Sequence, residues 1–148
     1  MPAMANPYLE AQVATASPER LHLMVIDGAI RFARQAQEAL QAGQFEKAFL
    51  AFNRSRECVN DILAGIDSDP NPGLADQLRA LFAYVLQNLA SGELLRDPQH
   101  VQNAIQILES HRQTWAQLIE IMVKARPETF ERVDPDFDNA PGTRSWTT

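Results

Sequence analysis

The sequence predicts an all-α protein, an antiparallel up-down four-helix bundle. Two cap-then-proline signals, Ser17-Pro18 and Asp97-Pro98, each mark the start of a helix. Apolar residues recur at helical spacing over long stretches, and no segment shows the sustained alternation of a strand or an Asn-Gly hairpin turn. Because the loops between the long amphipathic helices are short, successive helices should lie side by side and antiparallel.

The first helix is expected from residue 18 to about residue 42. Ser17 can accept hydrogen bonds from the first free backbone N–H groups, and Pro18 suits the first helical position, which needs no donor. Gly43 should stop the helix. Residues 21–32 are apolar over more than one narrow stripe, so this helix should contact protein on several sides.

The second helix is expected over residues 45–66, where the proline-rich segment 67–73 ends it. The third should begin near Leu74 and end around Gly92. The apolar residues at helical spacing are Phe45, Phe49, Phe52, Val59, Ile62, Leu63 and Ile66 in the second helix and Leu74, Leu78, Leu81, Phe82, Val85, Leu86 and Leu89 in the third. Most of this surface should be core, because a bundle helix contacts two neighbours.

The last helix should begin at Pro98 and end at Pro127, because a residue before proline is pushed out of helical geometry. Its core-facing stripe is predicted to contain Val101, Ile105, Leu108, Trp115, Leu118 and Met122. The helical domain would then cover residues 1–126, with an N-terminal arm over residues 1–17.

Residues 127–148 form a different kind of segment, rich in proline and acidic residues. Such a composition predicts a disordered tail. Three aromatic residues, Phe130, Phe137 and Trp146, are dispersed along it. The alternative is therefore an arm that binds back onto an apolar surface of the bundle.

Composition excludes several classes of protein. The 148 residues are 45% hydrophobic, enough for one core, and the net charge is -6. Arginines are interspersed among acidic and apolar residues, so no basic surface for nucleic acid is expected. The sequence has no signal-peptide pattern and no apolar run near the roughly 18 residues that a membrane helix needs. We therefore expect a cytoplasmic protein without membrane insertion, which fits its single cysteine.

Possible catalytic and metal-binding patterns are incomplete. Glu19 and His22 have the spacing of a di-iron helix, but the second copy that such a site needs is missing. Asp67 and Asp69 begin the spacing of a calcium loop whose glycine and bidentate glutamate are absent. Cys58 lies among apolar residues in the middle of a helix, where a structural thiol is expected. We expect no catalytic residue, no cofactor and no metal ligand, and hence no enzyme.

The segment TASPERL followed by LMVIDGAIRF resembles the start of the FliS family, the flagellin-specific export chaperones. The matching residues are Tyr8, Val13, Thr15, Ala16, Ser17, Pro18, Leu21, Met24, Asp27, Gly28, Ala29 and Phe32. Ile26 stands where the family usually has tyrosine. Weaker similarities continue along the chain as far as Trp115, through the segment LFAYV at 81–85 and the residues Ile107, Leu108, Arg112 and Trp115.

The resemblance implies an antiparallel four-helix bundle and a function. FliS-like proteins bind the C-terminal segment of flagellin, prevent its premature polymerisation and support its delivery to the flagellar type III export apparatus. In the family an N-terminal arm covers part of the client surface, and Tyr8, Leu9 and Val13 would have this role here. The alternative for these three residues is a hydrophobic staple or a plug of the core.

The partner-binding groove is predicted near the junction of the second and third helices, where apolar residues cluster around the proline-rich turn. The candidates are Cys58, Ile62, Leu74, Leu78 and Phe82. Such a groove could accept an amphipathic helix of another chain. The alternative function is a non-catalytic bundle that associates with itself and has a structural or regulatory role in flagellar assembly. A weak homodimer without client is compatible with either function.

Overall fold

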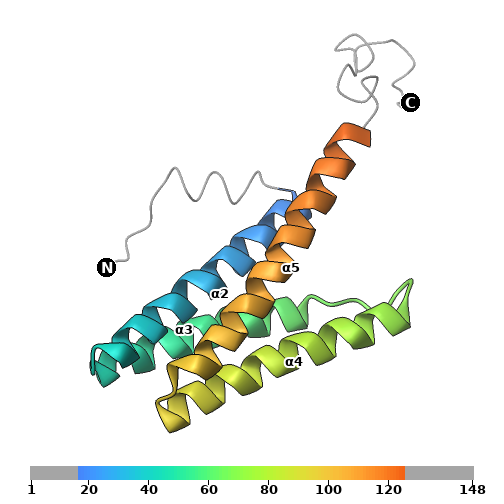
Figure 1. Cartoon of the computed structure of the whole chain (residues 1–148). Coiled ribbons are helices and arrows are strands. Elements are labelled where there is room, and N and C mark those ends of the chain that lie inside the picture. Colours follow the sequence, from blue (N-terminus) through green and yellow to red (C-terminus); the bar gives the residue numbers. More distant parts are fainter. Residues whose placement is uncertain (1–16, 126–148) are drawn as a thin grey trace, which may run out of the picture. The chain divides into compact units, whose positions relative to one another are not determined.

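The computed structural model describes residues 17–125, which form four α-helices joined by short loops. They are α2 (Pro18–Gln41), α3 (Phe45–Ala64), α4 (Pro72–Leu95) and α5 (Pro98–Ala125). Successive helices run in opposite directions (Figure 1). The predicted all-α class and four-helix arrangement are confirmed for this part of the chain.

Local hydrogen bonds to the capping side chains stabilise the predicted helix starts. The Ser17 hydroxyl accepts from the Arg20 backbone N–H at 3.3 Å, which caps α2. The Asp97 carboxylate accepts from the Gln99 backbone N–H at 2.9 Å at the start of α5. After α2 the chain turns at Gly43, whose φ of 72° lies in the left-handed region that favours glycine. These boundaries were predictable because they depend on neighbouring residues only.

The predicted limits of the two middle helices need correction. α3 ends at Ala64, two residues earlier than expected, and α4 begins at Pro72 because the Asn71 side chain accepts from the Leu74 backbone N–H at 3.1 Å. Asn71-Pro72 is thus a third cap-then-proline signal, hidden within a segment whose composition is typical of a loop.

Gly92 does not end α4, which continues to Leu95. It is buried at a close approach to α5, where an added Cβ would lie 2.7 Å from Cγ2 of Val101. The helix ends instead at Arg96, whose φ of 52° is left-handed. This glycine therefore allows α4 and α5 to pack closely and does not end the helix.

One hydrophobic core contains residues from all four helices. Its largest fully buried side chains include Phe52, Phe82, Ile26, Leu89, Ile105 and Leu108. The buried Ser55 hydroxyl donates to the Ala29 carbonyl at 2.9 Å, which satisfies a polar group that would otherwise be costly to bury. The predicted stripe of α5 is correct at Val101, Ile105 and Leu108 but wrong at Leu118, which is 40% exposed.

The described residues divide after Ala116 into a first unit, 17–116, and a second unit, 117–125, so α5 crosses the division between them. The candidate site described below lies within the first unit. The predicted domain limit at residue 126 stays a prediction, and the predicted tail lies outside the described residues.

Within residues 17–125, no helix combines the length and the apolar character needed to cross a membrane.

Candidate functional site

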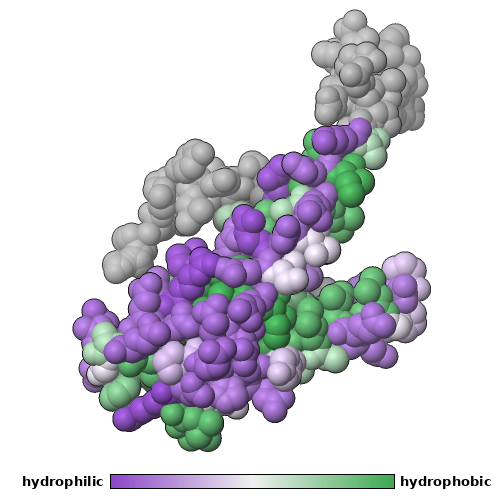
Figure 2. All heavy atoms as spheres, viewed as in Figure 1, coloured by the Kyte–Doolittle hydropathy of each residue, from purple (hydrophilic) through white to green (hydrophobic). Residues whose placement is uncertain are grey.

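An open groove of about 580 Å³ lies in the first unit where α2 begins, α3 ends and α4 begins. Its floor consists of Ile62, Ala75 and Phe82, which are at most 4% exposed. The rim includes Leu74, a large apolar side chain that is 51% exposed. In Figure 2, hydrophobic residues gather over α4 and beside α5. The groove is thus an apolar surface that opens directly to solvent.

Half-buried side chains from α2, α4, α5 and the loop after α3 form the walls. They are Leu21, His22 and Val25 from α2, Ile66 after α3, Leu78 from α4, and His111 and Trp115 from α5. Because these elements are held by the common core, the walls exist before any partner binds.

The α2–α5 wall contains two histidines in direct contact. Nε2 of His22 lies 3.1 Å from Nε2 of His111, and the Trp115 indole N–H donates to the Glu19 carbonyl at 2.9 Å. Burial lowers the pKa of His22, and burial together with the neighbouring His22 lowers the pKa of His111 to about 4. At neutral pH both rings are therefore uncharged, and one ring N–H donates to the other ring nitrogen.

The histidine pair does not extend to a larger ligand set. Among residues 17–125, no three His, Cys, Asp or Glu side chains are grouped as metal ligands. Aromatic rings surround the pair instead, with ring centroids 4.4 Å apart for His22 and Trp115 and 4.9 Å apart for Phe82 and His111.

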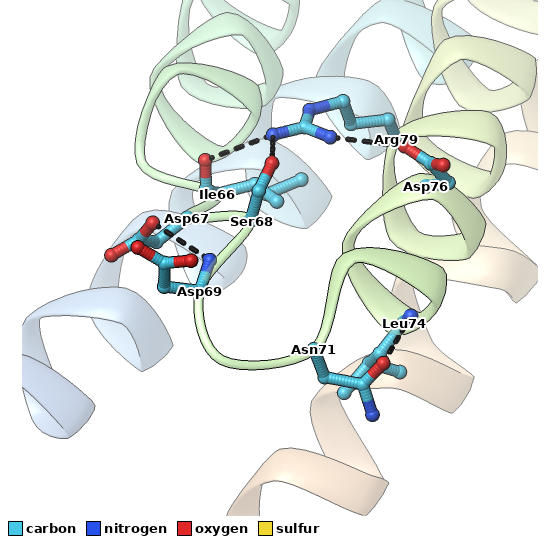
Figure 3. A network of polar contacts seen from close by, with 8 residues as sticks. All are labelled: Ile66, Asp67, Ser68, Asp69, Asn71, Leu74, Asp76 and Arg79. Carbon is cyan, nitrogen blue, oxygen red and sulfur yellow. Dashed lines mark hydrogen bonds and ion pairs between the residues drawn. The ribbon is translucent and has the colours of Figure 1, made fainter.

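Hydrogen bonds of Arg79 fix the loop that borders the groove (Figure 3). Its guanidinium donates to the Ser68 hydroxyl at 2.9 Å and the Ile66 carbonyl at 3.4 Å, and it pairs with Asp76 at 3.2 Å. Within the loop, the Asp67 carboxylate accepts from the backbone N–H of Asp69 at 3.1 Å. The rim therefore has a defined shape, although its residues are exposed.

An ion pair joins the two helices of the α2–α5 wall. The Arg112 guanidinium donates to the Asp27 carboxylate, and this hydrogen bond and the charge of Asp27 raise the pKa of Arg112. Asp27 belongs to the N-terminal motif and Arg112 to the motif near Trp115. Two segments that are separate in the sequence thus meet where α2 contacts α5, outside the groove lining.

The structure brings together four of the five predicted groove residues, Ile62, Leu74, Leu78 and Phe82. Cys58 is not among the residues that line the groove. Its sulfur lies toward α2, only 3.2 Å from where a Cβ on Gly28 would be. The role of these residues in binding another chain stays a prediction, and Tyr8, Leu9 and Val13 lie outside the described residues.

The predicted groove did not include the α2–α5 wall, which adds Leu21, Val25, His22, His111 and Trp115 to the lining. Two signals pointed there. The apolar breadth of residues 21–32 exceeds one stripe, and Trp115 belongs both to the core-facing stripe predicted for the last helix and to a motif. Neither signal alone shows which helix α2 would contact.

The fold and the groove define a small helical-bundle protein with a preformed apolar groove, the geometry used in helix-in-groove recognition. Comparison with known protein families identifies the family to which the chain belongs. The family model described as "Flagellar protein FliS" matches residues 1–122. The chain therefore belongs to the FliS family, which confirms the resemblance seen in its motifs.

Three relatives agree with this assignment. The flagellar secretion chaperone FliS of Salmonella typhimurium is 26% identical over 78% of this chain and 87% of its own length. FliS of Vibrio cholerae, also named a flagellar secretion chaperone, is 20% identical over 74% of this chain and 81% of its own length. The flagellar secretion chaperone FliSB of Pseudomonas aeruginosa is 22% identical over 72% of this chain and 85% of its own length.

Proposed function

We propose that this protein is a cytoplasmic flagellar export chaperone that binds the C-terminal segment of flagellin in the groove. It prevents premature polymerisation of flagellin and hands the client to a component of the export apparatus. Membership of the FliS family and the names of the relatives support a role in flagellar secretion. The observation that carries the finer proposal is the preformed apolar groove between the four helices.

The physical basis of binding is burial of apolar surface. Leu74 and Leu78 offer accessible side chains above a buried floor, and fully burying one such side chain contributes about 1.5–3 kcal/mol. A helical client satisfies its own backbone hydrogen bonds, so its apolar face can enter the groove without unpaired polar groups. Ordering the client offsets part of this gain, which keeps the affinity moderate and the complex reversible.

Prevention of polymerisation then follows from competition for one surface. The terminal segments of flagellin associate through apolar helix faces, and a face held in the groove cannot join another subunit. In this proposal the protein performs no catalytic step and needs no cofactor. Before the client binds, Tyr8, Leu9 and Val13 of the N-terminal arm would cover part of the same apolar surface.

The test compares two leucines of α4 by titration calorimetry against a peptide from the flagellin C-terminus. Leu78→Glu puts a charge into the apolar groove and should weaken binding at least 10-fold. Leu94→Glu is the matched control, because Leu94 is 82% exposed and does not line the groove. Equal affinities of two folded variants would contradict the proposal.

Exposed apolar residues outside the groove favour the second candidate, a self-associating bundle with a structural or regulatory role. Phe49, Leu50 and Leu95 are more than half exposed, and such surface on a small protein can support weak association with a second copy. Light scattering of the protein without client distinguishes the two functions. A tight dimer that does not bind the flagellin peptide would favour this candidate over the chaperone.

A further inference from the structure

The geometry points to a charge-selective groove: we propose that its preferred occupant is an amphipathic helix with lysine or arginine beside its apolar face. This inference rests on the proposed function, and it adds the chemistry by which one client helix is distinguished from another.

The acidic side chains of the groove lining come from α2, α3 and the loop after α3. Glu19 comes from the first turn of α2, Asp61 from α3, and Asp67 and Asp69 from the loop after α3. Among the described residues that line the groove there is no lysine or arginine. α4 contributes only apolar side chains to the lining, and α5 contributes His111 and Trp115. We call these four residues the acidic border of the groove; α4 and α5 contribute no acidic side chain to the lining.

The acidic border is not neutralised within residues 17–125. Ion pairs elsewhere join Asp27 to Arg112, Glu93 to Arg56, Glu109 to Arg34 and Asp76 to Arg79. None of the four acidic residues at the groove takes part in an ion pair with this part of the chain. Arg79, the cation beside the loop, is already held by Asp76 and by polar groups of the loop.

The histidines do not compensate for this charge. Both rings in the wall are uncharged at neutral pH, and their mutual contact uses the Nε2 atoms. A helix that binds in the groove thus lies close to four acidic side chains. The described lining supplies no positive charge that balances them. Cationic residues beside the apolar face of the client would supply this positive charge.

The expected size of the effect follows from the exposure of these groups. Asp61, Asp67 and Asp69 are exposed and Glu19 is half-buried. A single exposed ion pair changes affinity about 1.5- to 5-fold, and salt weakens it. Several pairs acting together should therefore change affinity about 10-fold at low ionic strength, with much of the effect in the association rate.

The test uses the full chain and designed helical peptides that share one apolar face and differ at its border positions, which are lysine, glutamine or glutamate. Titration calorimetry at low salt should rank them lysine, then glutamine, then glutamate, with about 10-fold between the first two. The advantage of the lysine peptide should shrink several-fold at 0.3 M salt, where the Debye length is about half its value near 0.1 M.

The double variant Glu19→Gln, Asp61→Asn should reduce the lysine advantage, so that the affinities of the lysine and glutamine peptides become more nearly equal. Glu46→Gln is the control for loss of an acidic charge outside the groove, since Glu46 lies in the first turn of α3 and does not line the groove, and it should leave the lysine advantage unchanged. Circular dichroism of each variant checks that the helices persist.

Two outcomes separate this inference from the proposed function. If the three peptides bind equally well, or if the double variant does not reduce the lysine advantage, charge selectivity is overturned while apolar recognition stands. If no designed peptide binds and the flagellin C-terminal peptide does not bind either, the groove is not a binding site and both proposals fail.

Discussion

The two ends of the first unit pack differently, although the same four helices form both. At the end where α4 meets α5, small residues let the helices approach closely: Ala33, Ala36, Ala48, Ala51 and Gly92 are all buried. At the other end the loop between α3 and α4 separates the helices, and the larger residues Leu74, Leu78 and Trp115 border an open groove. Side-chain size and loop length thus divide the bundle into a closed end with a tightly packed interior and an open end with an apolar groove.

The largest expected effect is at the closed part of the core. Phe52→Ala removes a fully buried ring and should lower the free energy of unfolding by about 3–5 kcal/mol. Phe49→Ala, three residues earlier on α3, removes a ring that is 54% exposed and should cost far less. Urea unfolding of both variants measures the difference. Similar losses for the two would contradict the assignment of Phe52 to the core.

A smaller loss of stability is expected when a single methyl group is added where α4 and α5 pack closely. In Gly92→Ala the new Cβ would meet Cγ2 of Val101 at 2.7 Å and two backbone atoms of α5 and its preceding turn at 3.3 Å. We expect a loss of about 1–3 kcal/mol in spite of the better helix propensity of alanine. Gly73→Ala is the control, because its Cβ would make only an ordinary contact at 3.6 Å. A Gly92→Ala protein as stable as the control would show that this approach is not tight.

Gly92 also shows a limit of prediction from the sequence. A glycine near the end of an apolar pattern predicts a helix stop, and only the position of α5 shows that its role is close packing. The starts of α2 and α5 were predictable because Ser17 and Asp97 act on their own next turn. The start of α4 was missed since Asn71-Pro72 lies in a loop-like composition.

The groove was predictable only where its residues lie on helices that are neighbours in the sequence. Ile62, Leu74, Leu78 and Phe82 lie on helices that follow each other in the chain, so their proximity follows from a short connection. The opposite wall brings His22 to His111, which are 89 positions apart in the sequence. No local pattern encodes that contact. Cys58 had suitable spacing but lies toward Gly28, because the rotation of α3 is set by its packing on α2.

The smallest predicted effect is a pH dependence of stability that originates in the open end. His111 has a pKa of about 4 in the folded protein, below its ordinary value of 6.5, because of burial and the neighbouring His22. Between these two values the unfolded chain binds a proton that the folded chain does not, so stability decreases as the pH falls from about 6.5 to 4. We expect a loss of roughly 1–2 kcal/mol, since solvent screens this partly exposed site.

The contribution of His111 is isolated by comparing the protein with His111→Gln in urea unfolding at pH 7, 5.5 and 4.5. The variant should lose less stability than the unsubstituted protein over this range. Parallel pH profiles would show that the ring titrates normally and that this wall is more hydrated than the packing indicates.

The central claim, that the groove receives the flagellin C-terminal segment, is tested most directly by the fluorescence of Trp115. The chain has two tryptophans, so Trp146→Phe leaves Trp115 as the single reporter in the groove wall. Titration with a tryptophan-free flagellin C-terminal peptide should give a saturable one-to-one blue shift, because the bound helix removes water from the indole. The added substitution Leu78→Glu should abolish this shift at the same peptide concentrations. Peptide binding detected by calorimetry without any change at Trp115 would place the client elsewhere and contradict the account.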